Sequence, residues 1–281
     1  MTAAVAPDLS TRPSGPILSG MAQTTRPQPN PVPVRAPRRL DLLSANIQAG
    51  HTTKRYREYF TGSWNHVLPS RHKRGNLDAL AERVAEFDIV GLQEADAGSL
   101  RSGFVNQTHY LAERAGFPFW SHQPNRRMAG ISASANGLLC RVEPDEVVDY
   151  TLPSRIPGRG ALLTRYGDGE DSLTVVIAHL SLSPRARSAQ LAFLGELLAG
   201  AGHKVLMGDF NCETDAEEMA PLFRNSSLEP PEHRVPSFPS WRPRRAIDHI
   251  LVSAGVQVEN RWALADLASD HLGVAARICL P

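Results

Sequence analysis

The chain has 281 residues, of which 42% are hydrophobic and 21% are charged, and its formal net charge is +1. This composition is typical of an ordinary globular protein with one large domain or two small ones. It excludes a protein with helical membrane spans, because no stretch approaches the ~18 consecutive apolar residues that a spanning helix needs.

The N-terminal segment is expected to be a tail that precedes a folded domain. Residues 1–40 contain eight of the 22 prolines and no aromatic residue, so they bury too little apolar surface to offset their ordering entropy. They carry five arginines and one acid, a net charge of +4, which leaves +1 minus +4, or −3, for the other 241 residues. We therefore predict a disordered tail over residues 1–39 and a folded domain over residues 40–281. A domain charge of −3 lacks the broadly basic surface of a dedicated nucleic-acid binder, although local basic patches remain compatible with it.

Short apolar runs with β-branched residues recur from Leu40 onward and predict strands. They are Leu40–Ile47, Phe87–Leu92, Gly137–Val142, Ala161–Tyr166, Leu173–Leu180, Val205–Met207, Ile247–Val252, Val256–Val258 and Val274–Leu280.

Three segments between these runs are predicted to be helical. A stripe of apolar residues with helical spacing begins at Leu77, in a helix expected to start near Asn76. Ser183 and Pro184 are typical of a helix start, and the apolar spacing continues to Gly200. Thr214-x-x-Glu217 is a capping box that predicts a third, short helix. Strands interspersed with a few helices favour an α/β domain of two packed sheets with helices outside.

Polar residues follow the apolar runs where the strands end. Asn46, Glu94 and His179 each come at the end of one run, and Gly208-Asp209-Phe210-Asn211 follows another. A buried polar group without a partner costs ~1–3 kcal/mol or more, so these side chains must meet solvent, a metal or one another. Two similar clusters, Asp248-His249 and Asp270-His271, flank later strands.

In their order along the chain, these segments resemble the endonuclease/exonuclease/phosphatase superfamily of deoxyribonuclease-like hydrolases. The matching segments are Ser44-Ala45-Asn46, Asp88-Ile-Val-Gly-Leu-Gln-Glu94, Asn136-Gly-Leu-Leu, Arg159-Gly-Ala-Leu, Ala178-His179-Leu, Gly208-Asp-Phe-Asn211, Ile247-Asp-His-Ile-Leu-Val-Ser253 and Ser269-Asp-His271. The resemblance implies a four-layer α-β-β-α sandwich of two mostly antiparallel (mixed) sheets flanked by helices. It also implies a divalent-metal-dependent hydrolase that cleaves a phosphoester, favouring a phosphodiester, by direct attack of an activated water.

The resemblance assigns a role to each of the polar residues. Glu94 is expected to be the main ligand of Mg²⁺ or Mn²⁺, with Asn46 beside it and Asp270 assisting on the metal side. The expected catalytic residues are Asp209 at the attacking water, Asn211, His179 and His271 at the phosphoryl oxygens, and Asp248 as the partner of His271. Arg159 and Asn136 are the candidate substrate-binding residues, although Arg159 could be an ordinary surface arginine and Asn136 could cap a turn with Gly137.

The chemistry favours these residue types independently of the resemblance. Mg²⁺ prefers oxygen ligands, which carboxylates and amides supply. The transition state of phosphoester hydrolysis places negative charge on oxygens, which a metal ion, an imidazolium and amide donors stabilise. Because water attacks directly, no nucleophilic thiol is needed, and Cys212 is expected to be a bystander. His51, His122, His203 and His249 are expected to be structural.

Two basic and aromatic segments are candidates for setting the substrate. The insertion between Asn46 and Asn76 could stack on a base, could meet lipid headgroups, or could simply pack on the domain's own edge. A second set, Trp241-Arg-Pro-Arg-Arg245, precedes Asp248, and Arg126-Arg127 could form a third rim. His179, with no tyrosine in its strand, departs from the abasic-site repair pattern, so a phosphodiesterase is favoured over a base-excision enzyme.

Three functions remain open at this point. The first is hydrolysis of nucleic acid, the second is the same chemistry on a phospholipid, sphingolipid or inositol-phosphate headgroup, and the third is a non-catalytic binding module. The presence of the whole polar set argues against the third. The cysteines Cys140, Cys212 and Cys279 form neither a disulfide framework nor a CxxC zinc site, and no apolar core of ~7–15 residues indicates a secretory signal. We therefore expect a cytoplasmic monomer without a transmembrane segment.

Overall fold

The computed structural model describes residues 39–48, 71–99, 102, 104–128, 132–155 and 158–281. The chain divides into two units, residues 1–32 and 33–281, and every described residue belongs to the second. The expected tail over residues 1–38 and the insertion over residues 49–70 lie outside the described residues. Arg39, which we assigned to the tail, is instead the first residue of a strand.

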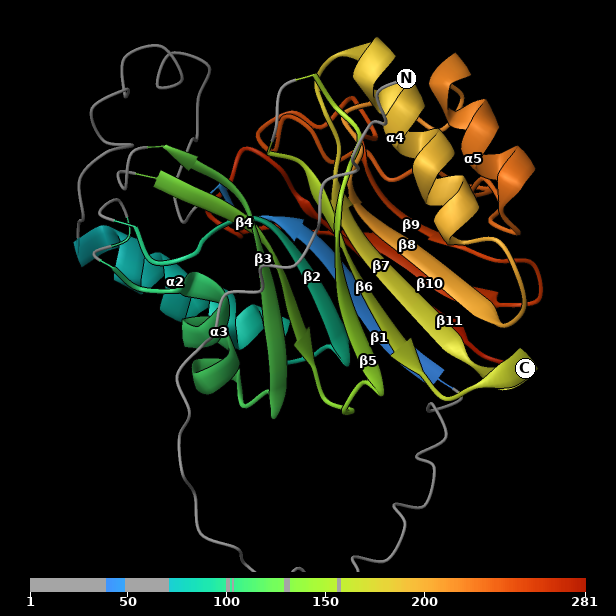
Figure 1. Ribbon diagram of the computed structural model, residues 1–281. Coiled ribbons are helices and arrows are strands. Elements are labelled where there is room, and N and C mark those ends of the chain that lie inside the picture. The colour runs from blue at the N-terminus through green and yellow to red at the C-terminus, as the bar shows by residue number, and fades with distance from the viewer. Residues whose placement is uncertain (1–38, 49–70, 100–101, 103, 129–131, 156–157) are drawn as a thin grey trace, which may run out of the picture. The chain divides into compact units, whose positions relative to one another are not determined.

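One mixed sheet has six strands in the order β10-β11-β1-β2-β4-β3 (Figure 1). Its central strands β1 and β2 pair in parallel, and all its other neighbours are antiparallel. The strands are β1 Arg39–Asn46, β2 Ile89–Asp96, β3 Phe119–Met128, β4 Ser132–Cys140, β10 Gln257–Leu264 and β11 Gly273–Cys279.

The other mixed sheet has five strands in the order β5-β6-β7-β8-β9. Here the parallel pair is β7 and β8, and the remaining pairs are antiparallel. The strands are β5 Glu146–Thr151, β6 Gly160–Tyr166, β7 Leu173–His179, β8 His203–Asp209 and β9 Asp248–Val252.

Three apolar layers hold the sheets and helices together. Side chains such as Leu42, Ile177 and Met207 fill the space between the two sheets. The helices α2 (Arg71–Val84) and α3 (Gln107–Ala115) pack on the outer face of the six-stranded sheet. The helices α4 (Pro184–Leu197) and α5 (Ala220–Asn225) pack on the outer face of the five-stranded sheet. The expected four-layer α/β sandwich is therefore confirmed.

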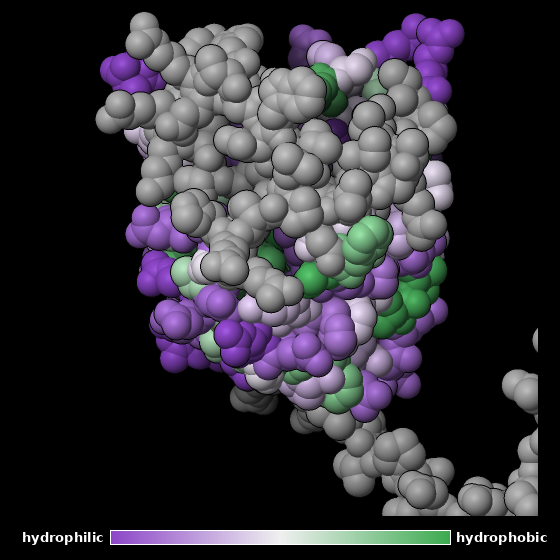
Figure 2. Space-filling view, turned by 90° about the vertical axis from the view of Figure 1, so that its left-hand side faces the viewer, coloured by the Kyte–Doolittle hydropathy of each residue, from purple (hydrophilic) through white to green (hydrophobic). Residues whose placement is uncertain are grey.

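The outer surface on the side of α2 and α3 is largely hydrophilic. Its apolar residues lie in small groups among hydrophilic ones (Figure 2). Within the described ranges, no helix has both the length and the apolar character needed to cross a membrane.

Each of the nine predicted strands is present, but some details were wrong. Two edge strands, β3 and β5, and the helix α3 were not predicted. The helix α2 begins at Arg71, earlier than the start expected near Asn76. The capping box at Thr214 does not form, because the chain enters a 3-10 turn at Glu217 with Ala216 as its N-cap and no side-chain cap bond.

The strand registers bring the polar strand ends to one edge of the sandwich. In the parallel pairs, Asn46 lies opposite Gln93, and His179 lies opposite Asp209. Asp248 begins the antiparallel strand β9 directly opposite Asp209. Asp270 and His271 precede β11, whose first residues pair with the end of β1. Because parallel strands end at the same edge and antiparallel neighbours begin there, the motifs of both sheets converge.

Candidate active site

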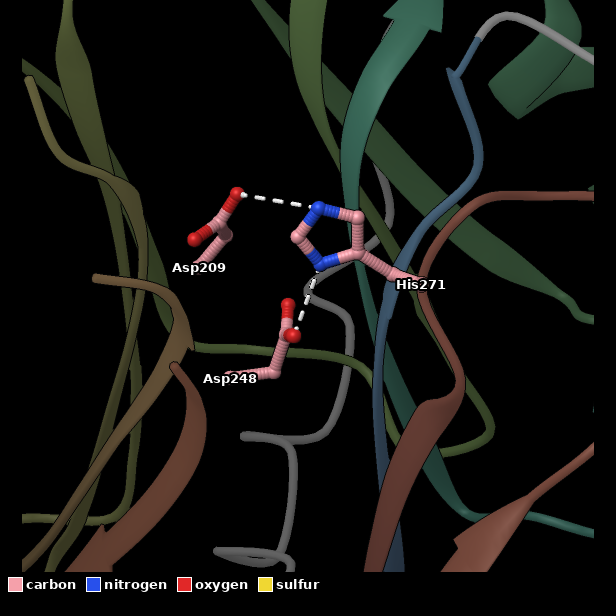
Figure 3. Close-up of side chains that lie close together, drawn as sticks. All are labelled: Asp209, Asp248 and His271. Carbon is pink, nitrogen blue, oxygen red and sulfur yellow. Dashed lines mark hydrogen bonds and ion pairs between the residues drawn. The ribbon is translucent and has the colours of Figure 1, made fainter. Parts of the chain in front are cut away.

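His271 lies between two carboxylates at this edge. Its Nδ1 donates a hydrogen bond to Asp248 Oδ2 over 2.8 Å, and its Nε2 lies 4.0 Å from Asp209 Oδ2 (Figure 3). Burial acts to lower the pKa of His271, but the charges of the surrounding carboxylates, Asp248 foremost, outweigh it and raise the pKa to about 10. The ring is therefore an imidazolium near neutral pH, with its Nε2–H facing the other carboxylate.

Asp248 and His271 are also held by a neighbouring loop. Ser237 Oγ donates to Asp248 Oδ2 over 2.6 Å, the same oxygen that accepts from His271. The ring of Phe238 packs against the His271 imidazole with ring centroids 4.9 Å apart. The Nδ1 atom and the ring of His271 are thus both held in place, which fixes the direction of Nε2.

The Asp209 carboxylate accepts hydrogen bonds from residues of both sheets. Its Oδ1 accepts from the backbone N–H of Asn211 over 2.9 Å, and its Oδ2 accepts from Asn46 Nδ2 over 3.1 Å. His179 Nε2 lies 3.4 Å from the same Oδ2. Burial, followed by the negative charge of Asp248, raises the pKa of Asp209 to about 7. The bond from Asn46 is the direct link from β1 in one sheet to β8 in the other.

His179, Asn211 and Arg159 line the side of the five-stranded sheet. Burial lowers the pKa of His179 well below its usual value, and the positive charges of Arg159 and His271 lower it further. His179 is therefore a neutral imidazole near neutral pH, and Arg159 lies close enough to act on its charge. Asn211 adopts a left-handed backbone with φ 57° and donates from Nδ2 to the carbonyl of Leu180 over 3.0 Å.

Glu94 occupies the end of β2 on the side of the six-stranded sheet. The β2–β4 pairing shifts register between Leu92 and Ala95, and Glu94 has a left-handed φ of 57°. Its carboxylate is half-buried, and no described residue forms a hydrogen bond or ion pair with it. Asn46, one strand away, accepts from the backbone N–H of Gln48 with its Oδ1. This bulge turns Glu94 out of the regular ladder at the edge where the other site residues gather.

The model of the Endonuclease/Exonuclease/phosphatase family matches residues 23–271 of the chain. The chain belongs to this family. Solved structures agree with this assignment at the level of the fold. An endonuclease/exonuclease/phosphatase from Beutenbergia cavernae DSM 12333 is 20% identical, with a TM-score of 0.66, covering 87% of this chain and 72% of that one.

Two further structural neighbours carry other names. A mannosyl-6-phosphatase of Bacteroides thetaiotaomicron is 18% identical, with a TM-score of 0.59, covering 86% of this chain and 100% of that one. The human Nocturnin catalytic domain with bound sulfate is 17% identical, with a TM-score of 0.62, covering 88% and 97%. At such identities these likenesses show the fold alone. No curated protein sequence matches the chain significantly.

The family implies a divalent cation, and the donors on the side of the six-stranded sheet fit one. Glu94, Asn46 and Asp270 all offer oxygen atoms, which Mg²⁺ and Mn²⁺ prefer. Asp270 is buried, and its Oδ1 lies 4.0 Å from His271 Nε2, so this carboxylate belongs to the same cluster. The half-buried carboxylate of Glu94, unpaired among the described residues, is the kind of group that a cation would neutralise.

A second acidic group is less suited to a cation. One potential ligand atom from each of Asp209, Asp248 and His271 lies within 4.8 Å of the others. The Asp248 oxygen and the His271 nitrogen, however, share a hydrogen bond, and the raised pKa of His271 places a positive charge there already. In this group the imidazolium of His271 therefore already occupies the position between the two carboxylates and offsets part of their negative charge.

Asn136 is the predicted site residue that the structure places apart from this cluster. It is fully buried in β4, and its Nδ2 donates to Gln123 Oε1 over 3.2 Å and to the carbonyl of Gly160 over 2.8 Å. Both amide hydrogens are used between the sheets, next to Arg159. These contacts indicate that Asn136 positions the start of β6. The role of Asn136 in substrate binding remains a prediction.

Sequence reasoning missed two residues that support the site. Ser237 lies in an irregular loop, and nothing in its surroundings indicates that it reaches Asp248. Asp96 ends β2 and accepts hydrogen bonds from the backbone of Gly98 and Ser99. The Asp-x-Gly-Ser sequence is a turn signal that could have predicted this second contact. The side chains of Arg126 and Arg127, the expected third rim, lie outside the described residues.

Proposed function

We propose that this protein is a divalent-metal-dependent hydrolase that cleaves a phosphodiester by direct attack of water. The observation that carries the proposal is the convergence of five buried polar side chains from both sheets, with Asp209 at their centre. They are Asn46, His179, Asp209, Asp248 and His271. The name of one structural neighbour, a mannosyl-6-phosphatase, is consistent with phosphoester chemistry.

His271 is proposed to bind the phosphoryl group. Its Nδ1 is committed to Asp248, which leaves the Nε2–H to donate to a non-bridging phosphoryl oxygen. His179, whose Nε2 also lies near Asp209 Oδ2, is proposed to donate its Nε2–H, and Asn211 its remaining amide hydrogen. Donors held in place before the reaction stabilise the charge that develops on these oxygens.

Asp209 is proposed to hold the attacking water. The water oxygen forms a bond to phosphorus, one of its protons passes to the Asp209 carboxylate, and the ester P–O bond breaks with its electron pair on the leaving oxygen. That oxygen takes up a proton, so the products are a phosphomonoester and an alcohol. A cation held by Glu94, Asn46 and Asp270 would supply Lewis-acid stabilisation of the phosphoryl charge.

The test uses the full chain with a chromogenic diester, bis(p-nitrophenyl) phosphate, and the corresponding monoester, each with Mg²⁺, Mn²⁺ or EDTA. We expect metal-dependent turnover of the diester that exceeds turnover of the monoester. Glu94→Gln and Asp209→Asn are each expected to lower kcat by about 10²–10³-fold, the size typical of removing one such group. Glu196→Gln, an exposed glutamate on α4, is the matched control and should keep full activity.

A second measurement separates metal binding from chemistry. Mg²⁺ should raise the Tm of the wild type and of Asp209→Asn, but not of Glu94→Gln, because a ligand that binds only the folded state stabilises it. Metal-loaded wild type that hydrolyses neither ester, nor any nucleic acid or phospholipid in a broader panel, would overturn the proposal. Equal Mg²⁺ shifts in wild type and Glu94→Gln would overturn the assignment of the metal ligand.

A further inference from the structure

One loop of the molecule is attached directly to the candidate active site. Residues 237–245 form a hairpin, here called the arginine hairpin, in which Phe238 and Arg245 pair as an antiparallel bridge. The backbone N–H groups of Phe238 and Arg245 each bond to the other's carbonyl, and the N–H of Arg242 bonds to the carbonyl of Pro239 at the tip. The hairpin is thus an ordered element with its own hydrogen bonds.

The base of the arginine hairpin is bonded to the segments that carry Asp248, Asp270 and His271. Besides the bond from Ser237 Oγ to Asp248, the backbone N–H of Ser240 donates to the carbonyl of Asp270 over 2.7 Å. Ser240 Oγ donates to the carbonyl of Ser269 over 2.8 Å. The hairpin therefore has a fixed position beside the proposed phosphoryl-binding residues.

The outer part of the hairpin exposes one aromatic ring and three cations. Trp241 is 37% exposed, and Arg242, Arg244 and Arg245 are all exposed. Among the described residues, no carboxylate forms an ion pair with any of these three arginines. Several other arginines are paired with carboxylates, namely Arg39, Arg114, Arg165, Arg187, Arg234 and Arg277. Cations left unpaired beside a phosphoester site have the chemistry to bind phosphates that flank the reacting one.

We infer that the arginine hairpin binds a single-stranded nucleic acid whose scissile phosphodiester lies in the active site. The guanidinium groups bind neighbouring phosphates, and the Trp241 indole stacks on a base, the combination that sequence-tolerant strand binders use. This inference names the substrate class of the site proposed above, so it rests on that proposed function.

A nucleic-acid strand fits the hairpin better than a lipid surface does. A segment that inserts into a bilayer needs a continuous group of apolar side chains. Among the large hydrophobic side chains exposed in the described residues, Trp241 is the one on this hairpin, and prolines and arginines surround it. The others, Phe104, Trp120, Val147 and Leu182, belong to other segments.

The first experiment measures binding without turnover. Anisotropy of a fluorescein-labelled 12-nucleotide oligothymidylate is followed in EDTA with the full-length wild type, with Trp241→Ala, and with a triple variant that changes Arg242, Arg244 and Arg245 to Gln. We expect Trp241→Ala to weaken binding about 10-fold, as for loss of one stacked base. The triple variant should weaken it about 10–100-fold at moderate salt and lower the salt slope by about 0.7 for each phosphate that the variant no longer binds.

Two matched variants control for exposed tryptophan and arginine in general. Trp120→Ala removes a ring that is 38% exposed at the start of β3, away from the site edge. Arg224→Gln removes an exposed cation on α5. Both should bind the oligonucleotide as the wild type does. Circular dichroism and Tm confirm that all variants are folded.

The outcomes separate this inference from the proposed function. Because binding is measured in EDTA, the anisotropy does not depend on whether the enzyme is active. Failure of the diesterase test therefore does not decide whether the hairpin binds a nucleic-acid strand. Hairpin variants that bind the oligonucleotide as tightly as wild type would overturn the inference even if the hydrolase is active. Absence of oligonucleotide binding by the wild type would do the same. Wild-type binding to phosphatidylserine vesicles but not to the oligonucleotide would replace the strand with a lipid surface.

Discussion

The two sheets contribute to the candidate site in different ways. On the five-stranded side, His179, Asp209 and Asp248 lie within a network of hydrogen bonds and ion pairs that the protein's own side chains form. Within the described residues, only Asp248 Oδ1 in this network is buried without a hydrogen-bond partner. On the six-stranded side, the Glu94 carboxylate stands in a bulge with a left-handed backbone and has no partner among the described residues. These halves are joined by the hydrogen bond from Asn46 to Asp209 and by His271, which bonds to Asp248 and also lies 4.0 Å from Asp209.

This difference indicates which half of the site is held together by protein groups alone and which half lacks a counter-charge. Two carboxylates, Asp209 and Asp248, lie close together on the five-stranded side, and the imidazolium of His271 between them offsets their repulsion. The contacts of that half are therefore made by the protein's own side chains. The half around Glu94 has a negative charge that no described side chain balances, so a cation is the group that would complete it. The five-stranded half, proposed to bind the phosphoryl group, should therefore be sensitive to changes in hydrogen bonding, and the half around Glu94 to removal of metal.

The largest effect should come from breaking the contact between Asp248 and His271. In Asp248→Asn the imidazole loses the charge that raises its pKa, and the amide can present a donor instead of an acceptor to Nδ1. We expect kcat on the chromogenic diester to fall at least 10²-fold, with a Mg²⁺-induced rise in Tm close to that of the wild type.

The metal response is what makes this variant informative. A merely structural role would lower Tm and the Mg²⁺ response together. If Asp248→Asn retained wild-type kcat, the dependence of the five-stranded half on the Asp248–His271 contact would be wrong. Asp171→Asn, at an exposed acid on a 3-10 turn, serves as the charge-matched control and should leave kcat unchanged.

The next effect should come from the loop that follows Glu94. Asp96 is fully buried, and its carboxylate accepts from the backbone N–H groups of Gly98 and Ser99 and from the hydroxyls of Ser99 and Ser102. Asp96→Ala leaves these donors without an acceptor, which should reduce the free energy of unfolding by about 2–3 kcal/mol, measured by urea denaturation.

The same variant tests whether this loop positions the metal side alone. Because Asp96 is two residues beyond Glu94, we expect the Mg²⁺ concentration for half-maximal activity to rise several-fold, with a smaller change in kcat at saturating Mg²⁺. A loss of kcat that added Mg²⁺ does not restore would show that the two halves of the site are coupled more tightly than their contacts indicate.

The central strands could be predicted from the sequence because burial on both faces requires apolar residues at nearly every position. β1, β2, β7 and β8 are buried on both faces, so they read as continuous apolar runs. β3 and β5 form edges of their sheets and are only partly buried, so neither contains the continuous apolar run of a central strand. Tertiary pairing, which local sequence does not record, makes them strands.

The candidate site likewise contains residues that could be predicted from the sequence and residues that could not. Asn46, His179 and Asp209 interrupt apolar runs where strands end. Parallel pairing brings His179 and Asp209 together, and the packing of the two sheets brings Asn46 to Asp209. Ser237 could not be predicted, because its contact with Asp248 depends on how an irregular loop folds back over the site. Asn136 could be singled out by its motif, but its position between the sheets depends on the packing of β4 against β6.

The smallest expected effect is on the pH dependence of stability, through two histidines whose pKa values Asp248 influences. Burial lowers the pKa of His249, against the hydrogen bond to the Cys212 carbonyl and the charge of Asp248, whereas the pKa of His271 is raised to about 10. The contribution of His271 to stability is therefore complete below its unfolded pKa of about 6.5 and is lost as the pH rises through about 10. For His249 the sign is opposite, because its contribution is complete above about 6.5 and is lost as the pH falls below that value.

His249→Gln should remove the acid-side part of this dependence while keeping an amide that can donate to the Cys212 carbonyl. Between pH 7 and pH 5, the free energy of unfolding of the wild type should fall more steeply than that of the variant, by less than about 1.4 kcal/mol per pH unit, the limit for one proton. Urea denaturation at several pH values measures both slopes. His233→Gln, at an exposed histidine, should follow the wild type, because its ring meets solvent in the folded and the unfolded chain. Parallel curves for wild type and His249→Gln would mean that His249 already accepts a proton in the folded protein, and the contrast between the two histidines would not hold.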